Sequence, residues 1–380
     1  MKKILSLALT AVMLLALSAC EKTGGSSGGT IKIGATGPLS GGAAIYGMAA
    51  RNGAQIAVDE INAKGGMQYE LNYQDDEHDA EKAMNAYNAL KDWGIQISLG
   101  SVTSTPGVAT SVENNADRIF ALTPSASAVA VTEGKDNVFQ MCFADPNQGS
   151  ASAQYISDQS LGSKIAVIYK NDDVYSTGIY ETFKTKAVGL GLEIVSTTTF
   201  TEDSQQDFSV QLADAKANGA DLIFLPMYYT PASLIFQQAK AMDYGPKYFG
   251  VDGMDGILTL EGFDASLAEG VMLLTPFNAD ATDERTTGFV AKYQKAYNEI
   301  PNQFAADGYD CVYAIHQAVT NGKIAASMDA SAMCDTLIKQ FTSMTYNGLT
   351  GDNMSWGTNG QVDKAPKGMV IQNGAYVGMD

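Results

Sequence analysis

Short apolar segments alternate with longer segments of helical period along the chain after residue 30. Four apolar runs in the first part predict strands, at residues 31–35, 69–73, 95–99 and 119–122. Between the first two, Ala50, Ala54, Ala57 and Ile61 recur every three or four positions, which is the period of one helix face. That helix is expected to end at the glycine pair that follows Lys64.

A second series of the same kind begins near residue 150. Its predicted strands are 165–169, 193–200, 221–226, 248–251 and 271–275, and its predicted helices are 178–188, 208–217 and 231–242. Strands that alternate with helices predict parallel sheets with helices on both faces. The predicted fold class is therefore α/β, with two doubly wound parallel-sheet lobes joined by a multi-strand hinge.

The last hundred residues change this order. Helices are predicted at 284–299 and 304–320, followed by short strand-like pieces with Gly348, Gly351, Gly357 and Gly360. We expect the chain to return to the first lobe near residue 276 and to cross again near residue 350. The predicted first lobe then comprises residues 31–147 and 276–349, and the second comprises 148–275 and 350–380.

Hydroxyl side chains are concentrated in two loops that each follow an apolar run. The first, GSVTSTPG, contains Ser104, and the second, TPSAS, contains Ser125 and Ser127. Loops at the carboxyl ends of parallel strands form the ligand crevice of an open α/β sheet, and hydroxyls suit a small polar ligand. The alternative is local: Ser104 or Thr105 caps a helix whose first residue is Pro106.

The first twenty residues have the order of a secretory signal, with Lys2 and Lys3, an apolar stretch and then small residues. The apolar stretch is too short to span a bilayer. Its end, LSAC, resembles the bacterial lipobox, which implies cleavage before Cys20 and a lipid on that cysteine. We therefore expect a signal peptide over residues 1–19 and a lipid-anchored Gly/Ser tether over residues 20–30.

The chain is strongly acidic. Its formal net charge is −18, and loss of Lys2 and Lys3 with the signal makes it −20. This charge argues against nucleic acid as a partner and against charge-driven binding to anionic membranes. Beyond Cys20, the spacing of Cys142, Cys311 and Cys334 fits neither a zinc site nor a redox pair. We expect buried or free thiols, with a Cys311–Cys334 disulfide as the alternative.

Few residues suit catalysis or metal binding. His316 lies at helical spacing among apolar residues and is predicted to be structural. His78 lies in DDEHDAE, but Ala80 and Ala86 occupy the positions where a calcium loop needs Gly and Glu. A turn before a helix N-terminus explains these acids better. The sequence has no phosphate loop, so we expect no metal, no cofactor and no enzymatic activity.

The chain resembles the leucine/isoleucine/valine-type substrate-binding proteins of ABC transporters, which have the type I periplasmic-binding fold. The resemblance covers nearly all of residues 31–380. It rests on the order and spacing of several segments, among them IKIGATGPLSGGAAIYG, AVDEINAKGGMQYEL, GSVTST, ALTPSAS, KIAVIYKNDDVYSTG, DFSVQLADAKANGADLIFLP, YFGVDG and FAADGYDCVYAIHQA.

The resemblance implies a ligand site between the lobes. Ser104, Ser125 and Ser127 match positions that contact the carboxylate and ammonium of an amino acid, and Asp252 matches an acidic residue that binds the ammonium. Three tyrosines match positions that wall the pocket: Tyr46, Tyr175 and Tyr229. Tyr228, next to Tyr229, leaves that last assignment uncertain by one residue. Such contacts suit a buried zwitterion, whose two charges both need partners.

Two positions depart from the family. Some members have a disulfide between the acidic loop and the first hydroxyl loop, where this chain has His78 and Thr103. Asp252 is also shorter than the Glu often found there, so a bulkier ammonium-side group, a bridging water or a different ligand is an alternative.

The resemblance implies a monomeric, extracytoplasmic lipoprotein on the bacterial cell membrane. It would close its lobes around a small amino acid, branched-chain or otherwise apolar, and deliver it to the permease subunits of an ABC transporter. Two alternatives stay open. The ligand could be another small acid or amide, or the protein could sense its ligand for a membrane signalling partner.

Overall fold

The computed structural model describes residues 29–379. The predicted signal peptide, Cys20 and most of the predicted tether lie outside these residues. No helix in the described part of the chain is both long and apolar enough to cross a membrane.

The first lobe is built on a five-stranded parallel sheet in the order β2-β1-β3-β4-β5. Its strands are β1 (Thr30–Gly37), β2 (Gln68–Asp75), β3 (Ile97–Ser98), β4 (Phe120–Thr123) and β5 (Val138–Gln140). Its helices are α2 (Ala44–Ala63), α3 (Ala80–Trp93), α4 (Ser104–Ala116), α5 (Val129–Thr132), α10 (Glu284–Tyr297), α11 (Gln303–Asn321) and α12 (Ala330–Phe341). This strand order places a topological switch point between β1 and β3.

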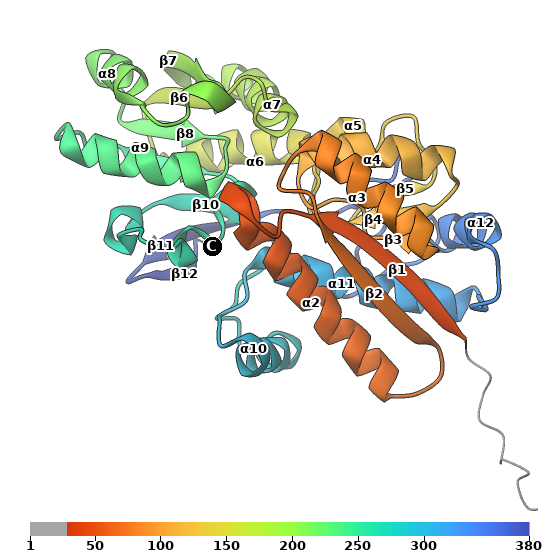
Figure 1. The fold of residues 1–380 in the computed structure, drawn as a ribbon. Helices are drawn as coiled ribbons and strands as arrows, with labels where there is room; N and C mark the ends of the chain where they lie inside the picture. The colour runs from red at the N-terminus through yellow and green to blue at the C-terminus, as the bar shows by residue number, and fades with distance from the viewer. Residues whose placement is uncertain (1–28, 380) are drawn as a thin grey trace, which may run out of the picture.

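The second lobe contains a seven-stranded sheet in the order β12-β11-β10-β9-β8-β6-β7. Its strands are β6 (Lys164–Lys170), β7 (Glu193–Phe200), β8 (Leu222–Leu225), β9 (Lys247–Gly250), β10 (Met272–Thr275), β11 (Lys367–Gln372) and β12 (Ala375–Gly378). Its helices are α6 (Asp145–Asp158), α7 (Val174–Leu190), α8 (Ser209–Ala217) and α9 (Tyr229–Ala241). Strands β6 to β10 repeat the order of the first lobe, and the two lobes lie side by side (Figure 1).

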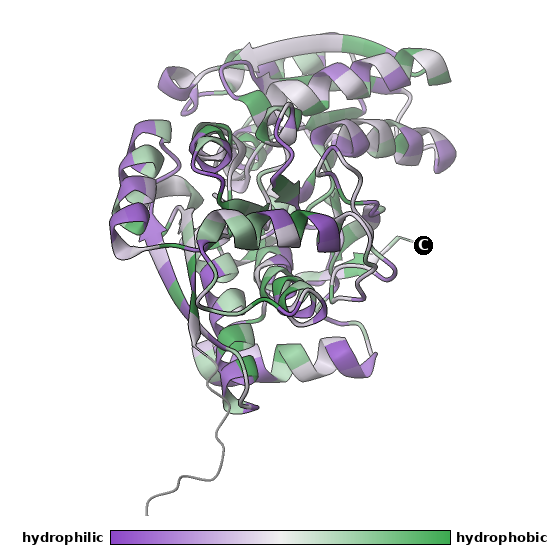
Figure 2. Cartoon of the chain, turned by 90° about the vertical axis from the view of Figure 1, so that its right-hand side faces the viewer, coloured by the Kyte–Doolittle hydropathy of each residue, from purple (hydrophilic) through white to green (hydrophobic). Residues whose placement is uncertain are grey.

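The predicted α/β fold with two parallel sheets is confirmed, with one addition. Strands β11 and β12 extend the second sheet by antiparallel pairing, β11 with β10 and β12 with β11. The hydropathy follows this architecture, because apolar residues are concentrated in the inner strands and polar residues on the outer faces of the helices (Figure 2). The inner strands are buried from both sides, as expected for parallel sheets, whereas the edge strands β2, β7 and β12 are partly exposed.

The sequence-based prediction omits β5, α5, α6 and α12, in addition to the two antiparallel strands β11 and β12. Helix α6 has few large apolar residues because it packs very closely on α7. A Cβ at Gly149 would lie 2.4 Å from the carbonyl oxygen of Ile179. The glycine-containing pieces after residue 345 form only isolated bridges, between Tyr346 and Met354 and between Trp356 and Val362.

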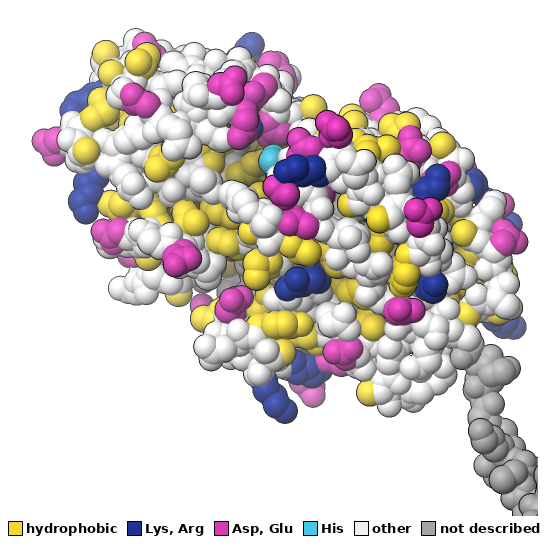
Figure 3. Space-filling model, in the orientation of Figure 1, with side chains coloured by type: hydrophobic (Ala, Val, Ile, Leu, Met, Phe, Trp, Pro, Cys, Tyr) yellow, Lys and Arg dark blue, Asp and Glu magenta, His cyan; other side chains and the backbone are white. Residues whose placement is uncertain are grey.

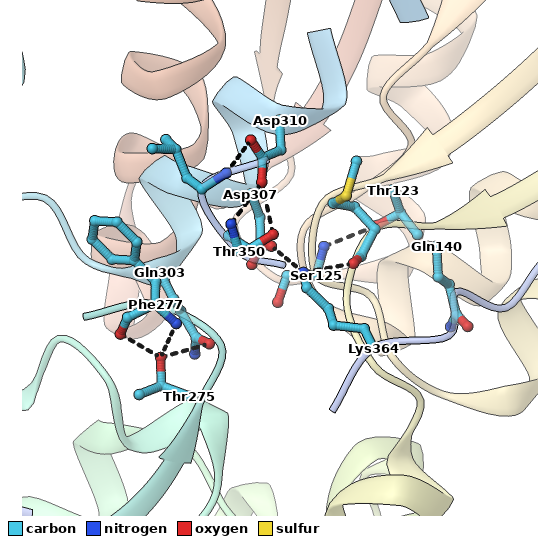
Figure 4. A network of polar contacts seen from close by, with 12 residues as sticks. Thr123, Ser125, Gln140, Thr275, Phe277, Gln303, Asp307, Asp310, Thr350 and Lys364 are labelled. Carbon is cyan, nitrogen blue, oxygen red and sulfur yellow. Dashed lines mark hydrogen bonds and ion pairs between the residues drawn. The ribbon is translucent and has the colours of Figure 1, made fainter. Parts of the chain in front are cut away.

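Three segments cross between the lobes, and polar contacts tie them together (Figure 4). The first crossing follows β5 and the second follows β10. The third precedes β11, and Trp356 Nε1, before it in the chain, donates to the carbonyl of Gln140 in the first lobe, at 2.8 Å. Lys364, close to the crossing, donates to the carbonyl of Met141 at 2.8 Å and to Asp307 Oδ1 at 3.0 Å.

Candidate functional site

The first lobe contributes the two hydroxyl loops, which follow β3 and β4. Thr103 is the N-cap residue of α4 and Ser104 its first helical residue, so the alternative in which Pro106 begins the helix is wrong. The hydroxyl of Ser104 accepts hydrogen bonds from the amides of Ser127 (3.2 Å) and Ala128 (3.1 Å), which holds the two loops together. The side chain of Thr103 makes no capping hydrogen bond to α4, so the N-terminus of this helix is available to an anionic group.

The second lobe contributes residues that follow β6, β8 and β9. The hydroxyl of Tyr175 donates to Asp252 Oδ1 and accepts from the amide of Gly253 at 2.9 Å. The rings of Tyr175 and Tyr228 are stacked, with centroids 4.7 Å apart and planes 4° from parallel. Asp252 and Tyr175 are each 3% exposed, so this part of the site is almost fully enclosed.

Tyr46 joins the two lobes across the site. Its hydroxyl donates to the carbonyl of Gly253 and accepts from the amide of Tyr229 at 3.1 Å. The hydroxyl of Tyr229 in turn accepts from the amide of Ile45 at 3.3 Å. Further contacts between the lobes link Thr230 to the carbonyl of Gly42 (2.7 Å) and Thr105 to Asp173 (3.2 Å). These bonds describe a closed arrangement of the lobes.

Tyr228 and Tyr229, between which the sequence could not choose, both lie near the interface of the lobes but in different surroundings. Tyr229 packs edge-on against Tyr46, with ring centroids 4.7 Å apart, and its hydroxyl is used in lobe closure. Tyr228 stacks on Tyr175, and its buried hydroxyl has no hydrogen-bond partner among the described residues. A hydroxyl without a partner is available to a ligand, so Tyr228 is the better candidate for a direct contact.

Two residues that the sequence argument omits belong to the same place, Asp145 and Gln148. Asp145 follows β5 at the start of α6, and its amide donates to the carbonyl of Ser127 at 3.0 Å. Gln148 lies one turn later, and its Oε1 accepts from the amide of Asp252 at 3.2 Å. The motif FADPNQ contains a carboxylate and a Pro typical of a helix start, but β5 before it is too short to be recognised.

Several buried polar atoms around these residues make no hydrogen bond of normal geometry in the described part of the chain. They are Ser127 Oγ, Asp145 Oδ1 and Oδ2, Gln148 Nε2 and Tyr228 Oη. Ser127 lies close enough to Asp145, and Gln148 to Asp252, to lower the pKa of each carboxyl group, but neither pair has full hydrogen-bond geometry. Buried polar groups in folded proteins are nearly always paired, so such a cluster needs an explanation. A small polar ligand that carries both donors and acceptors would satisfy these atoms together.

Two buried carboxyl groups dominate the electrostatics. Burial raises the pKa of Asp252 to about 7, although the hydrogen bond from Tyr175 opposes the shift. Burial also raises the pKa of Asp145 well above its usual range, Ser127 opposes this, and the neighbouring Asp252 adds to it. Like charges in one enclosed place disfavour ionisation. A cation between Asp145 and Asp252 would therefore be bound strongly.

The acidic loop lies against the first hydroxyl loop at the edge of the site. His78 Nδ1 is 2.8 Å from Thr103 Oγ1, so a hydrogen bond joins the two positions where some members of the resembled family have a disulfide. The His78 ring also packs edge-on against Tyr228 of the other lobe, with centroids 5.2 Å apart. Acidic side chains lie on both sides of the junction between the lobes (Figure 3).

The other candidates for chemistry have structural roles. Cys142, Cys311 and Cys334 are buried free thiols, so the alternative of a Cys311–Cys334 disulfide is wrong. The predicted structural role of His316 fits its hydrogen bond with the hydroxyl of Tyr69, at 3.0 Å. Within residues 29–379, no group of three or more His, Cys, Asp or Glu side chains could hold a metal ion.

Comparisons with known proteins agree with this architecture. The chain is 28% identical over 312 residues to the Leu/Ile/Val-binding protein BraC3 of Rhizobium johnstonii, which covers 81% of this chain and 83% of that protein. It is 27% identical over 297 residues to the leucine-, isoleucine-, valine-, threonine- and alanine-binding protein of Pseudomonas aeruginosa, covering 76% and 78% of the two chains.

Solved structures give the same result. The substrate-binding protein LivJ of Streptococcus pneumoniae, solved in complex with isoleucine, superposes with a TM-score of 0.82 at 28% identity and covers 92% of this chain and 98% of its own. The leucine-binding protein LivK of Thermotoga maritima superposes with a TM-score of 0.81 at 25% identity, with the same coverage. The model of the periplasmic binding protein family matches residues 30–375, and this chain therefore belongs to that family.

Proposed function

We propose that this protein binds a small α-amino acid between its closing lobes, with a branched-chain or other apolar side chain, and delivers it to an ABC permease. The observation that carries the proposal is the enclosed cluster of unpartnered polar atoms where the two lobes meet. The binding properties of the relatives named above support the choice of ligand class.

The geometry suggests how the two charges of an amino acid would be held. The ammonium would lie between Asp145 and Asp252, whose carboxylates, when ionised, offer it only hydrogen-bond acceptors. The carboxylate would lie at the N-terminus of α4, where Ser104 begins the helix and the backbone dipole favours an anion. Ser125, Ser127 and the Tyr228 hydroxyl would complete this polar end, with Tyr175 as a wall.

The affinity of such a site is reasonable in magnitude. A hydrogen bond to a charged group contributes about 1.5–3 kcal/mol, and a micromolar ligand needs about 8 kcal/mol in total. Five or six contacts of this kind suffice after the costs of ordering the ligand and closing the lobes. Bonds between the lobes, such as those of Tyr46, form only on closure and would couple it to binding.

We further propose that Cys20 carries the lipid that keeps the mature protein on the outer side of the cell membrane. The lipobox-like LSAC sequence and the Gly/Ser-rich residues after it support this. Mass spectrometry of the protein purified from membranes should give an N-terminal peptide that begins with a lipid-modified Cys20. An unmodified N-terminus upstream of Cys20 would contradict the proposal.

The ligand class is tested by thermal shift with each of the twenty amino acids. A ligand at one hundred times its Kd stabilises the folded protein by about 2.7 kcal/mol, which raises the melting temperature measurably. We expect leucine, isoleucine or valine to give the largest increase. If no amino acid raises the melting temperature, the proposed ligand class is wrong, and small acids and amides are the next series to test.

A further inference from the structure

A cavity lies between the lobes on the other side of the turn that carries Asp252. Its volume is about 400 Å³, within the usual range for sites of small organic ligands. The second lobe contributes the residues after η3 (Asp252–Met254) and the hairpin between β11 and β12. The first lobe contributes the loop between α10 and α11, and the second crossing segment completes the wall.

The lining of this cavity is apolar and acidic. Its apolar walls include Leu258, Phe277, Ile300 and Pro301, and Ile300 is 61% exposed. Its charged lining residues are Asp255, Asp280 and Glu299, and neither Lys nor Arg is among the described residues that line it. An exposed isoleucine at an acidic cavity fits a ligand that has an apolar body and a positive charge.

Asp255 supplies an independent indication of a ligand. It lines the cavity, it is only 3% exposed, and its Oδ1 makes no hydrogen bond of normal geometry in the described structure. The nearby Tyr376 hydroxyl, which also lines the cavity, only partly offsets the rise that burial causes in the pKa of Asp255. Its other oxygen, Oδ2, accepts from the amide of Gln303 at 2.9 Å, which joins the second lobe to the start of α11. A buried carboxylate oxygen without a partner is costly, and an ammonium group would remove that cost.

We propose that this cavity binds a small primary amine with an apolar body, whose ammonium group pairs with Asp255. Because the walls come from both lobes, an amine bound there favours the closed arrangement. Gln303 connects the two sites directly, since its Nε2 donates to the carbonyl of Asp252 at 2.7 Å while its amide donates to Asp255. The proposal of an amine site does not rest on the proposed function. The proposed effect of the amine on amino-acid affinity does rest on the proposed function.

The test is calorimetric titration of the mature protein with phenethylamine, with and without saturating leucine. We expect phenethylamine to bind in both conditions, and more tightly with leucine present. The neutral analogue 2-phenylethanol should bind about tenfold more weakly or worse, because it lacks the charge. The substitution Asp255→Asn should weaken phenethylamine by a similar factor.

A cavity-filling variant separates the site from general effects on folding. Ala279 lines the cavity, so Ala279→Trp should abolish phenethylamine binding and leave leucine affinity without amine within about twofold. Ala325 is exposed elsewhere on the first lobe, so Ala325→Trp should change neither the affinity for phenethylamine nor the affinity for leucine. The amine site would be overturned by any of three results. Leucine could displace phenethylamine, the Ala279→Trp variant could bind phenethylamine as well as the unmodified protein does, or phenethylamine could fail to bind at about 10 mM. Equal leucine affinity with and without amine would overturn the effect on closure.

Discussion

At the scale of single residues, the site consists of polar groups that the fold buries without partners. Asp145, at the start of α6, and Asp252, after β9, both belong to the second lobe and would repel each other in the absence of a cation. Burial raises the pKa of both carboxyl groups, and the charge of Asp252 raises the pKa of Asp145 further, so the neutral forms are favoured. A bound ammonium group offsets this repulsion, so we expect both carboxyl groups to be ionised when the ligand is present.

The first prediction concerns these two carboxylates. Asp252→Asn and Asp145→Asn should each cost about 2–5 kcal/mol of ligand binding, because the ammonium loses an ionised partner. Isothermal titration with leucine measures the change. Asp158→Asn, at an exposed position on α6, is the matched control and should bind leucine normally. Native affinity in either site variant would remove that residue from the proposed ammonium site.

At the scale of elements, α2 and α11 pack so closely that they determine where the site residues lie. A Cβ on Gly53 of α2 would lie 1.8 Å from the carbonyl oxygen of Ala305. A Cβ on Gly308 of α11 would lie 2.2 Å from the carbonyl oxygen of Ala50. Glycine is therefore required at both positions. The N-terminal ends of these helices carry Tyr46 and Gln303, which both bond to the second lobe.

The second prediction follows from this packing. Gly53→Ala should force the helices apart and cost about 1–3 kcal/mol of folding stability or more, as overpacking does. It should also weaken leucine binding, because Tyr46 moves with α2. Gly288→Ala in α10 is the control, since nothing lies near its added Cβ, and it should slightly stabilise the protein. Urea unfolding compares the two, and equal stabilities would contradict the packing argument.

The hinge segments are held by a buried ion pair. Lys364 and Asp307 are 1% and 2% exposed, and Lys364 also binds the carbonyl of Met141 on the first crossing. Burial raises the pKa of Asp307 to about 6, and Lys364 opposes that shift. The Lys364–Asp307 pair therefore connects α11 to the first crossing. Lys364 itself lies close to the third crossing.

The third prediction tests this pair by breaking and then replacing it. Lys364→Met should destabilise the folded protein by about 3–5 kcal/mol, because it leaves Asp307 buried without a cation. The double variant Lys364→Met/Asp307→Leu should recover most of that loss, since two apolar side chains of similar volume need no partner. Thermal unfolding of the three proteins provides the measurement. A double variant as unstable as the single one would show that the loss comes from packing and the bond to Met141.

At the scale of the whole molecule, lobe closure buries a histidine. His78 of the first lobe packs against Tyr228 and lies in a small interlobe cavity with Lys170, Asp173 and Glu202 of the second. Burial lowers the pKa of His78, Asp173 and Glu202 oppose this, and Lys170 adds to it. Opening the lobes would hydrate the ring and return its pKa toward the ordinary value near 6.5. The open form therefore binds more protons than the closed form.

The fourth prediction is a pH dependence of ligand affinity. A group that binds fewer protons in the closed state disfavours closure as the pH falls, so leucine affinity should decrease by up to about tenfold between pH 7.5 and pH 5.5. His78→Gln should remove part of this dependence, and the ionisation of Asp145 and Asp252 on ligand binding should account for the part that remains. His316→Gln changes a histidine that bonds to Tyr69 within the first lobe, and it should keep the dependence of the unmodified protein. A His78→Gln variant with an unchanged pH profile would contradict this role.

The sequence by itself determined the architecture. Alternating strand and helix patterns predicted the class, the two lobes and most of the elements, because buried parallel strands need continuous apolar runs and their helices need an apolar face. The elements it omitted have weak patterns or unusual contacts. Helix α6 is rich in small residues because it packs closely on α7, and no local sequence pattern indicates how close two helices will pack.

The family resemblance nominated Ser104, Ser125, Ser127, Tyr175 and Asp252, all of which follow the carboxyl ends of strands. Their roles in ligand binding remain predictions for the experiments above. Asp145 and Gln148 were not nominated, because the strand before them has only three residues. The choice between Tyr228 and Tyr229 was also open, since adjacent side chains cannot be distinguished by spacing that is uncertain by one residue.

Only the tertiary structure decided which groups are left without partners. Asp145 and Asp252 lie 107 positions apart in the chain, and their proximity depends on how α6 and the loop after β9 are placed on the second sheet. Closure of the lobes places His78 against Tyr228 and forms the cavity at Asp255. Local sequence determines secondary structure through short-range sterics and burial, whereas burial without a hydrogen-bond partner is a property of the assembled lobes.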